Sequence, residues 1–490
     1  MAAGAGSPSS RDVVRNSAVL AAAKVLERAT GFAISVLVAS ALGADGLGVY
    51  ATAWAVYGLL WTIGDAGATE YLIRAVSRDP ARTGTYTVHL SIVALGAASV
   101  LVLGGQLIVP HLGYSDELET SVRIVLLALL PRVVNTIQEA VFIAHGRVRY
   151  ETWTRLVSST VYVGSAAVLL HRGAPVHHLL TALVVIEYVV ALTYFALITR
   201  CIARLRLRFR RSLAVQLVSD MRWFTASTAL AALFARPEII ILSLVSSERQ
   251  VGLYGAALRL AELPLLLSEA FNRSVYPRLA HSFGRSEDEF HEWQRFSVRA
   301  MHAYALPVAA LVFVTAPELV QLVFGDGFAG AATPLRILST NVVVLSLISV
   351  HWRLLAARDR QRSNVLAQAG AVTVELGAGV ALAVAFGAVG AALSNVGAST
   401  VYLLLLLAAT RRSGARSAVL ATGWRFAASA GLAGAASGLL LTAVPLALAV
   451  AAGSTAYLAL VFLTGAATSR DREVVSRLWR RHREGSVSAR

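Results

Sequence analysis

Cationic side chains lie inside long apolar stretches of this sequence, where a charge needs a task or a partner. A charged residue at the centre of a spanning helix costs ~2.5–3.5 kcal/mol on insertion scales. Lys24 and Arg28 are four positions apart, so one helix face would hold both. Arg259 and Arg273 share a second stretch, and Arg236 lies deep in a third. Because arginine forks match phosphate oxygens and a lysine ammonium adds a point charge, these five residues are candidates for binding a phosphate-bearing anion.

Carboxylates in the same kind of stretch could bind and release a proton or a cation, since they too would be held out of water. The candidates for this coupling role are Glu27, Asp65, Glu70, Glu262, Glu269 and Glu375. The alternative is structural pairing. Arg259 with Glu262 and Arg273 with Glu269 are three and four positions apart, the spacings that form ion pairs along a helix.

The elements that must position these charges are membrane helices. The chain has 490 residues, of which 56% are hydrophobic and 15% charged, and its mean hydropathy is +0.64. A soluble domain is normally about 25% charged, so lipid must cover much of this surface. Apolar segments of membrane-spanning length are expected at about 17–42, 47–72, 85–110, 121–144, 154–170, 179–199, 222–246, 253–277, 300–320, 330–352, 363–385, 388–410, 423–443 and 447–467.

Arginines predict the orientation of these segments. Clusters of arginine recur in every second loop, whereas the intervening loops hold only Arg172 and Arg249. Basic loops stay in the cytoplasm, so both termini should be cytoplasmic. The sequence therefore predicts an all-α polytopic protein of about fourteen helices in a bacterial inner membrane.

Several function classes are excluded or disfavoured. Lys24 is the only lysine and follows Ala23, so no Walker A motif exists. Cys201 is the only cysteine, which excludes an internal disulfide and a cysteine-based metal site. The net charge of +16 is spread between apolar runs, which fits topology and anionic lipids better than nucleic acid. We expect no catalytic residues, no metal, no cofactor and no enzymatic activity.

The chain repeats itself. Gly-Val-Tyr-Ala at 48–51 returns as Gly-Leu-Tyr-Gly at 252–255, an offset of 204 that also relates Arg74 to Arg278. Repeats of like orientation are one way to build a transporter from two halves. We therefore expect an N-terminal lobe at 1–200, a basic linker at 201–215, a second six-helix lobe at 216–411, two further helices at 412–467 and a basic tail at 468–490.

Four segments resemble the polysaccharide transporter branch of the MOP (multidrug/oligosaccharidyl-lipid/polysaccharide) superfamily. They are LGADGLGVYATAWAVYGLLWTIGDAGATEYLIRAVSRD, SSERQVGLYGAALRLAELPLLLSEAFNRSVYPRLA, APELVQLVFGDGFAGAATPLRILS and AARDRQRSNVLAQAGAVTVELGAGVALAVAFGAVGAALSNVGAS. The resemblance implies two pseudo-symmetric lobes, a central cavity and alternating access. Lipid-flipping members are similar in placing arginines on the first and eighth helices, which Lys24, Arg28, Arg259 and Arg273 match.

The resemblance implies a flippase that moves a polyprenyl-pyrophosphate-linked oligosaccharide of the cell envelope to the outer leaflet. A peptidoglycan lipid-precursor flippase and a cation-coupled multidrug antiporter are the alternatives. Cationic residues in the cavity favour an anionic lipid head, and carboxylates would favour cations. Expected partners are the lipid-linked oligosaccharide and anionic membrane lipids, with a polysaccharide polymerase or glycosyltransferases as further candidates. We expect no nucleic acid, and a monomer is the default.

Overall fold

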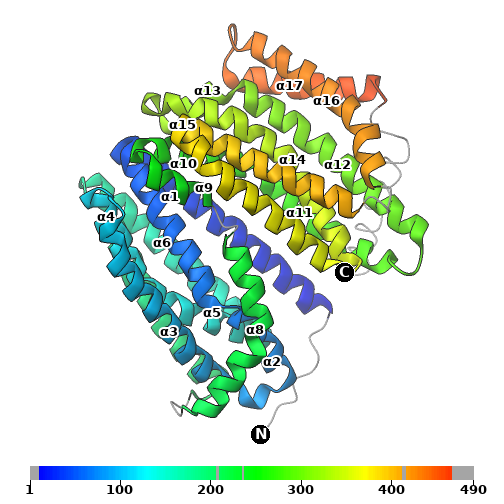
Figure 1. The fold of residues 1–490 in the computed structure, drawn as a ribbon. Coiled ribbons are helices and arrows are strands. Elements are labelled where there is room, and N and C mark those ends of the chain that lie inside the picture. The colour runs from blue at the N-terminus through cyan, green and yellow to red at the C-terminus, as the bar shows by residue number, and fades with distance from the viewer. Residues whose placement is uncertain (1–9, 206–208, 234–236, 411–414, 466–490) are drawn as a thin grey trace. The chain divides into compact units, whose positions relative to one another are not determined.

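A computed structural model describes residues 10–205, 209–233, 237–410 and 415–465 (Figure 1). For residues 10–27, 415–422 and most of 223–233 it describes the path of the helix and not the side chains. Every long element in the described part of the chain is an α-helix, and no strand occurs there. The predicted all-α class is confirmed.

The helices of the first half are α1 (Ser10–Asp65), α2 (Ala68–Arg78), α3 (Thr83–Ile108), α4 (Asp116–Leu127), α5 (Leu129–Ala144), α6 (Val148–His171), α7 (Val176–Cys201), α8 (Arg211–Leu233), α9 (Pro237–Val245) and α10 (Glu248–Glu262). Those that follow are α11 (Leu265–Ser282), α12 (Glu287–Val314), α13 (Ala316–Phe324), α14 (Ala332–Ala357), α15 (Gln361–Ala409), α16 (Ala415–Leu440) and α17 (Leu446–Leu463).

Two of these helices are pairs joined at a glycine. Gly43 in α1 has φ 68° and ψ −163°, and Gly387 in α15 has φ 56° and ψ −128°, so neither is helical. Side chains rarely tolerate such angles, which explains why glycine stands at both turns. The predicted segment boundaries at 42/47 and 385/388 fall at these two residues.

Three predicted segments are interrupted where the sequence suggested one continuous helix. The segment 47–72 breaks at Ala66 and Gly67, which both have positive φ. The segment 121–144 divides at Ala128, between α4 and α5. The segment 253–277 divides just before α11, at Pro264, because proline has no N–H to give to the preceding turn. The apolar content was read correctly, but these local breaks were not predicted.

The helices are long and apolar enough for a multi-pass membrane protein. Nine stretches of the described chain meet the length and hydropathy of a membrane span. Two of them, Arg28–Arg78 (51 residues) and Gln361–Ala409 (49 residues), are long enough to cross twice. Large apolar side chains such as Leu107, Leu192 and Leu439 are more than two-thirds exposed, as expected of surfaces that face lipid.

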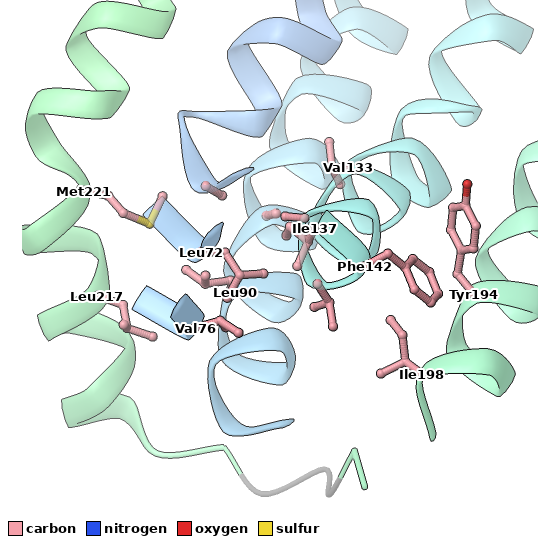
Figure 2. Close-up of a cluster of buried hydrophobic side chains, with 14 of the residues drawn as sticks. Leu72, Val76, Leu90, Val133, Ile137, Phe142, Tyr194, Ile198, Leu217 and Met221 are labelled. Atoms are coloured by element: carbon pink, nitrogen blue, oxygen red, sulfur yellow. The ribbon is translucent and has the colours of Figure 1, made fainter. Parts of the chain in front are cut away.

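The chain divides into two compact units, Met1–Ala256 and Ala257–Arg490. In the first, an apolar cluster joins α2, α3, α5, α7 and α8, with Leu72, Phe142 and Tyr194 fully buried (Figure 2). In the second, one cluster joins α11, α12, α14 and α15, and a smaller one joins α16 and α17 to α12. The lobe and linker boundaries expected from the sequence stay a prediction.

Within the first unit, the two copies of the repeated glycine motif contact each other. A Cβ atom on Gly48 of α1 would lie 1.9 Å from the carbonyl oxygen of Glu248. A Cβ atom on Gly252 of α10 would lie 1.8 Å from the carbonyl oxygen of Ala44. Only glycine lets two helix backbones approach so closely. The Gly-x-Tyr motif is therefore repeated because each copy packs against the other.

Candidate functional site

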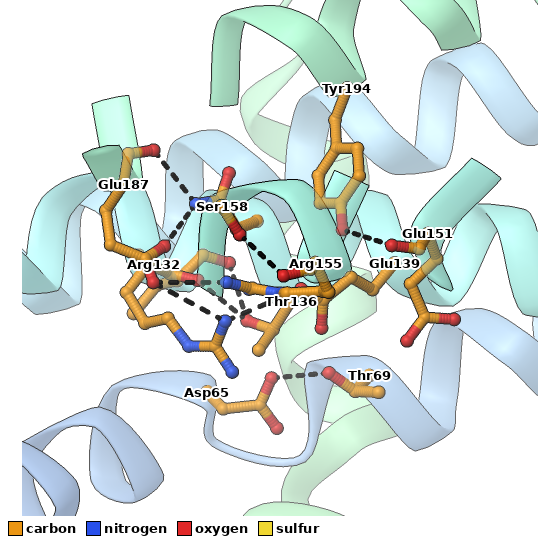
Figure 3. Close-up of polar contacts among 12 residues, drawn as sticks. Asp65, Thr69, Arg132, Thr136, Glu139, Glu151, Arg155, Ser158, Glu187 and Tyr194 are labelled. Atoms are coloured by element: carbon orange, nitrogen blue, oxygen red, sulfur yellow. Dashed lines mark hydrogen bonds and ion pairs between the residues drawn. The ribbon is translucent and has the colours of Figure 1, made fainter. Parts of the chain in front are cut away.

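Four charged side chains meet inside the helix bundle of the first unit (Figure 3). Arg132 and Glu139 lie seven positions apart on α5, Arg155 comes from α6 and Glu187 from α7. We call these four residues the charge cluster. Glu187 and Arg132 keep only 8% and 10% of their side-chain surface exposed.

Each cation of the charge cluster pairs with both anions. Arg155 donates from Nε to Glu139 Oε1 at 2.8 Å and from Nη1 to Glu187 Oε1 at 3.1 Å. Arg132 Nη1 lies 3.5 Å from Glu139 Oε1 and 3.9 Å from Glu187 Oε1. Two cations and two anions leave the cluster electrically neutral, which is the arrangement that a water-poor interior demands.

Neighbouring side chains on α1 and α5 complete the surroundings. The guanidinium of Arg132 lies over the ring of Trp61, 4.0 Å from its centre. Asn135 donates to Glu187 Oε2 at 2.6 Å and to the Glu187 carbonyl at 3.0 Å. Asp65 accepts a hydrogen bond of 2.6 Å from Thr69 (Figure 3). Through these contacts the charge cluster links α1, α5, α6 and α7.

Sequence reasoning missed the charge cluster. Arg155 stands close to the arginines of a predicted cytoplasmic loop, but α6 begins at Val148 and holds Arg155 in its second turn. Glu187 stands alone in an apolar run of α7, and Arg132 and Glu139 share one face of α5. The signal that could have identified them is a charged residue inside an apolar segment, the same signal that singled out Lys24 and Arg259.

In the second unit, two predicted cations form the local pairs that were the structural alternative. Arg273 and Glu269 of α11 form an ion pair with 48% and 34% of their side chains exposed. Arg259 Nη1 lies 3.9 Å from Glu262 Oε2 on α10. Neither pair is deeply buried, because each of the four side chains keeps between 20% and 48% of its surface exposed.

Polar contacts with α14 set the orientation of α11. Ser268 and Ser346 hydroxyls are 2.7 Å apart, and Asn272 donates to Ser349 Oγ at 2.5 Å. These contacts turn the Ser268–Asn272 face toward α14. The adjacent face, with Glu269 and Arg273, is left more exposed.

The remaining predicted residues fall into three groups. Arg28 and Glu70 are exposed, and Glu375 is 8% exposed within α15. Lys24 and Glu27 lie on α1 where side chains are not described, and Arg236 lies outside the described residues. Arg28 belongs to the first unit, and Arg259 and Arg273 to the second, so their grouping in one site stays a prediction.

Metal chemistry finds no support in the described part of the chain. There, no group of three or more His, Cys, Asp or Glu side chains is placed to hold an ion. His177 has its Nδ1 3.0 Å from Glu117 Oε2 and its ring against that of His178.

The sequence matches a protein family and a flippase of known sequence. The family described as "Polysaccharide biosynthesis protein" matches residues 37–333, more than half of the chain. A probable low-salt glycan biosynthesis flippase of Haloferax volcanii is 23% identical over 391 residues, which cover 78% of this chain and 80% of that protein.

Solved structures share the fold. The lipid II flippase MurJ in an inward closed conformation matches with a TM-score of 0.74 at 12% identity, covering 90% of this chain and 97% of that one. An inward-facing multidrug resistance transporter of the MATE family, in the MOP superfamily, matches with a TM-score of 0.67 at 14% identity, covering 79% and 94%. At such identities the likeness concerns the fold. The family match over residues 37–333 leads to one conclusion: this chain belongs to the family of polysaccharide biosynthesis proteins.

Proposed function

We propose that this protein is a flippase that moves a polyprenyl-pyrophosphate-linked oligosaccharide from the inner to the outer leaflet of the cell membrane by alternating access. The observation that supports the proposal most directly is Arg273. This guanidinium lies on a helix of a candidate membrane span, yet 48% of its side chain is exposed, and the Glu269 carboxylate that pairs with it is itself 34% exposed. An accessible arginine at such a position suits an anionic head group.

The chemistry of the cargo matches this arrangement. A pyrophosphate carries at least two negative charges, and a guanidinium binds phosphate oxygens through two parallel N–H donors. In the proposed mechanism Lys24, Arg28, Arg236, Arg259 and Arg273 hold the pyrophosphate while the sugar follows. Exchange of the Glu269 carboxylate for a phosphate oxygen would conserve the charge pairing of Arg273.

Energy coupling is assigned to the carboxylates in this proposal. Asp65 is the most developed candidate in the first unit, because it is half-buried at the end of α1 and hydrogen-bonded to Thr69. Glu27, Glu70, Glu262, Glu269 and Glu375 complete the proposed set. Transport measured with and without a proton or cation gradient across the vesicle membrane tests this energy coupling separately from the identity of the cargo.

Reconstitution in liposomes tests the function. The cargo is a fluorescent polyprenyl-pyrophosphate oligosaccharide, and its accessibility to a membrane-impermeant quencher is followed in each leaflet. The variants are Arg28→Ala and Arg273→Ala. Arg123→Ala is the matched control, because Arg123 also pairs with a glutamate four positions away, Glu119, at 3.1 Å.

We expect wild type and Arg123→Ala to translocate the lipid and both test variants to lose most of that activity. Parallel vesicles with the peptidoglycan lipid precursor, and with a cationic dye under a proton gradient, test the two alternatives. Translocation of the dye alone would overturn the proposal in favour of a drug antiporter. If both variants translocate the oligosaccharide lipid as fast as wild type, the proposed function would hold, but Arg28 and Arg273 would have no role in binding the pyrophosphate.

A further inference from the structure

The first unit also holds an arginine-lined cavity that shares no residue with the charge cluster. A cavity of about 420 Å³ opens between α2, the start of α3 and α8. Arg74 and Arg78 line it from α2, Arg222 from α8, and Tyr71 and Tyr86 from α2 and α3. Its volume lies within the ~300–1,000 Å³ of small-molecule sites.

The apolar side of the same helices fixes the cavity in place. Leu72 and Val76 of α2 face Leu217 and Met221 of α8 in the buried core of the first unit (Figure 2). Arg74 follows Leu72 by two residues and Arg78 follows Val76 by two, so both arginines leave the buried face of α2 and are exposed where they line the cavity. The packing that buries one face of α2 therefore presents both arginines to the cavity.

Three arginines and two aspartates, Asp79 and Asp220, line the cavity, so positive charge is in excess there. Asp79 pairs with Arg82 at 3.1 Å, and Asp220 accepts a hydrogen bond of 3.4 Å from Tyr71. Among the described residues, no carboxylate lies within ion-pair distance of Arg74 or Arg78. These two cations are one turn apart on α2, an arrangement that is unfavourable unless an anion bridges them.

The position of the cavity along the helices indicates at which level of the membrane its ligand would lie. One candidate span ends at Arg78 and the next begins at Pro80, so the arginines stand where apolar sequence gives way to the interface. The backbone just before α8 is tied to α3, since the Arg210 N–H donates to His89 Nε2 at 2.9 Å. This is the face that the arginine pattern predicts to be cytoplasmic, where anionic headgroups concentrate.

We propose that the cavity between α2 and α8 binds the phosphate of a lipid headgroup, with Arg74 and Arg78 as its two guanidinium forks. Arg222 adds a third donor, and the tyrosine rings form the wall. The phosphate belongs either to a resident anionic phospholipid or to a polyprenyl pyrophosphate on the leaflet from which cargo is taken. Binding here requires no translocation, so the inference goes beyond the proposed function.

Equilibrium binding in a non-ionic detergent tests the site with the full-length protein. The probes are fluorescent dioleoyl phosphatidylglycerol, a polyprenyl pyrophosphate, and dioleoylglycerol, which lacks the phosphate. The test variant is Arg74→Ala/Arg78→Ala. The matched control is Arg149→Ala/Arg200→Ala, which removes two exposed arginines of the same unit, on the same predicted face, outside the cavity.

We expect the test variant to weaken binding of at least one phosphate-bearing lipid about tenfold or more, because two charge-assisted contacts are lost. The control should change it less than about threefold, and dioleoylglycerol binding should not respond. Arg74→Lys/Arg78→Lys keeps the charge and should still weaken binding, which covers the case in which the alanine variant does not fold.

The two lipids identify the source of the phosphate. If the test variant binds phosphatidylglycerol more weakly, the ligand is a resident phospholipid. If only the binding of the polyprenyl pyrophosphate is weakened, the ligand is the cargo. Equal losses in test and control variants, or no loss for either lipid, would overturn the site. Protein that binds lipid here without flipping it would contradict the proposed function and leave this inference intact.

Discussion

Gly48 and Gly252 occupy equivalent places in a reciprocal contact, each against a main-chain carbonyl of the other's helix. Gly48 approaches Glu248 and Gly252 approaches Ala44. Ala44 and Glu248 are 204 positions apart, as Gly48 and Gly252 are. The crossing of α1 and α10 is therefore symmetric in sequence as well as in space, and neither helix can gain a side chain at this point without moving.

Alanine at either glycine should destabilise the protein. The added methyl of Gly252→Ala would collide with the Ala44 carbonyl, and overpacking of this kind costs about 1–3 kcal/mol. Thermal unfolding of purified protein in detergent measures the change. Gly58→Ala, also in α1, meets nothing within 4 Å and serves as the control. Equal melting temperatures for Gly252→Ala and Gly58→Ala would show that α1 and α10 can move apart at this crossing without loss of stability.

Removal of one charge of each sign from the charge cluster should destabilise the protein less than removal of a single charge. Glu187→Met alone leaves Arg155 and Arg132 with one carboxylate between them, and breaking a buried pair costs about 3–5 kcal/mol. Glu187→Met/Arg155→Met removes one charge of each sign and should recover part of that loss. Unfolding of the two single variants and the double variant gives the coupling energy. Strict additivity would mean that the four charges act independently.

Removal of the carboxylate beside Arg273 should strengthen cargo binding if this arginine holds the pyrophosphate. Glu269 competes for the same guanidinium, so Glu269→Gln should lower the apparent KM for the lipid cargo in vesicles. Glu119→Gln frees Arg123 in the same way and should leave KM unchanged. A higher KM or lost activity in Glu269→Gln would instead indicate that the carboxylate is part of the transport cycle.

The turn inside α15 should depend on glycine at one position. Gly387 has φ 56°, a conformation in which an L-residue costs roughly 1–2 kcal/mol. Gly387→Ala should lower the melting temperature, whereas Gly377→Ala, in the regular helical part of α15 and in open space, should preserve or slightly raise it. A higher melting temperature for Gly387→Ala than for Gly377→Ala would exclude a strained turn.

The sequence predicted the helices well because hydropathy and glycine act locally. Gly43 and Gly387 mark turns that can be read from their neighbours alone, and the apolar run after each is long enough to span. The break at Ala66 was missed because a positive φ at alanine has no signature in the sequence. It follows from the contacts around it, including a hydrogen bond of 2.7 Å from Thr225 to the Ala66 carbonyl.

The site was harder to predict, because charge pairing depends on which helices are neighbours. Glu269 and Arg273 could be paired from their spacing on one helix. Arg155 and Glu187 lie on different helices, 32 positions apart, and no periodicity relates them. The cationic cavity likewise needs α2 and α8 side by side before Arg74 and Arg222 can share it.

The crossing of Gly48 and Gly252 also bears on how such a chain arose. In a two-fold homodimer, residue i of one subunit touches residue j of the other, and j touches i in return. Here one polypeptide makes that exchange with itself, between Gly48 and Glu248 and between Gly252 and Ala44. A half-length ancestor with a single Gly-x-Tyr motif would have formed the same crossing as an isologous dimer. After gene fusion the rest of each copy would be free to diverge, whereas both positions of the crossing would have to remain glycine.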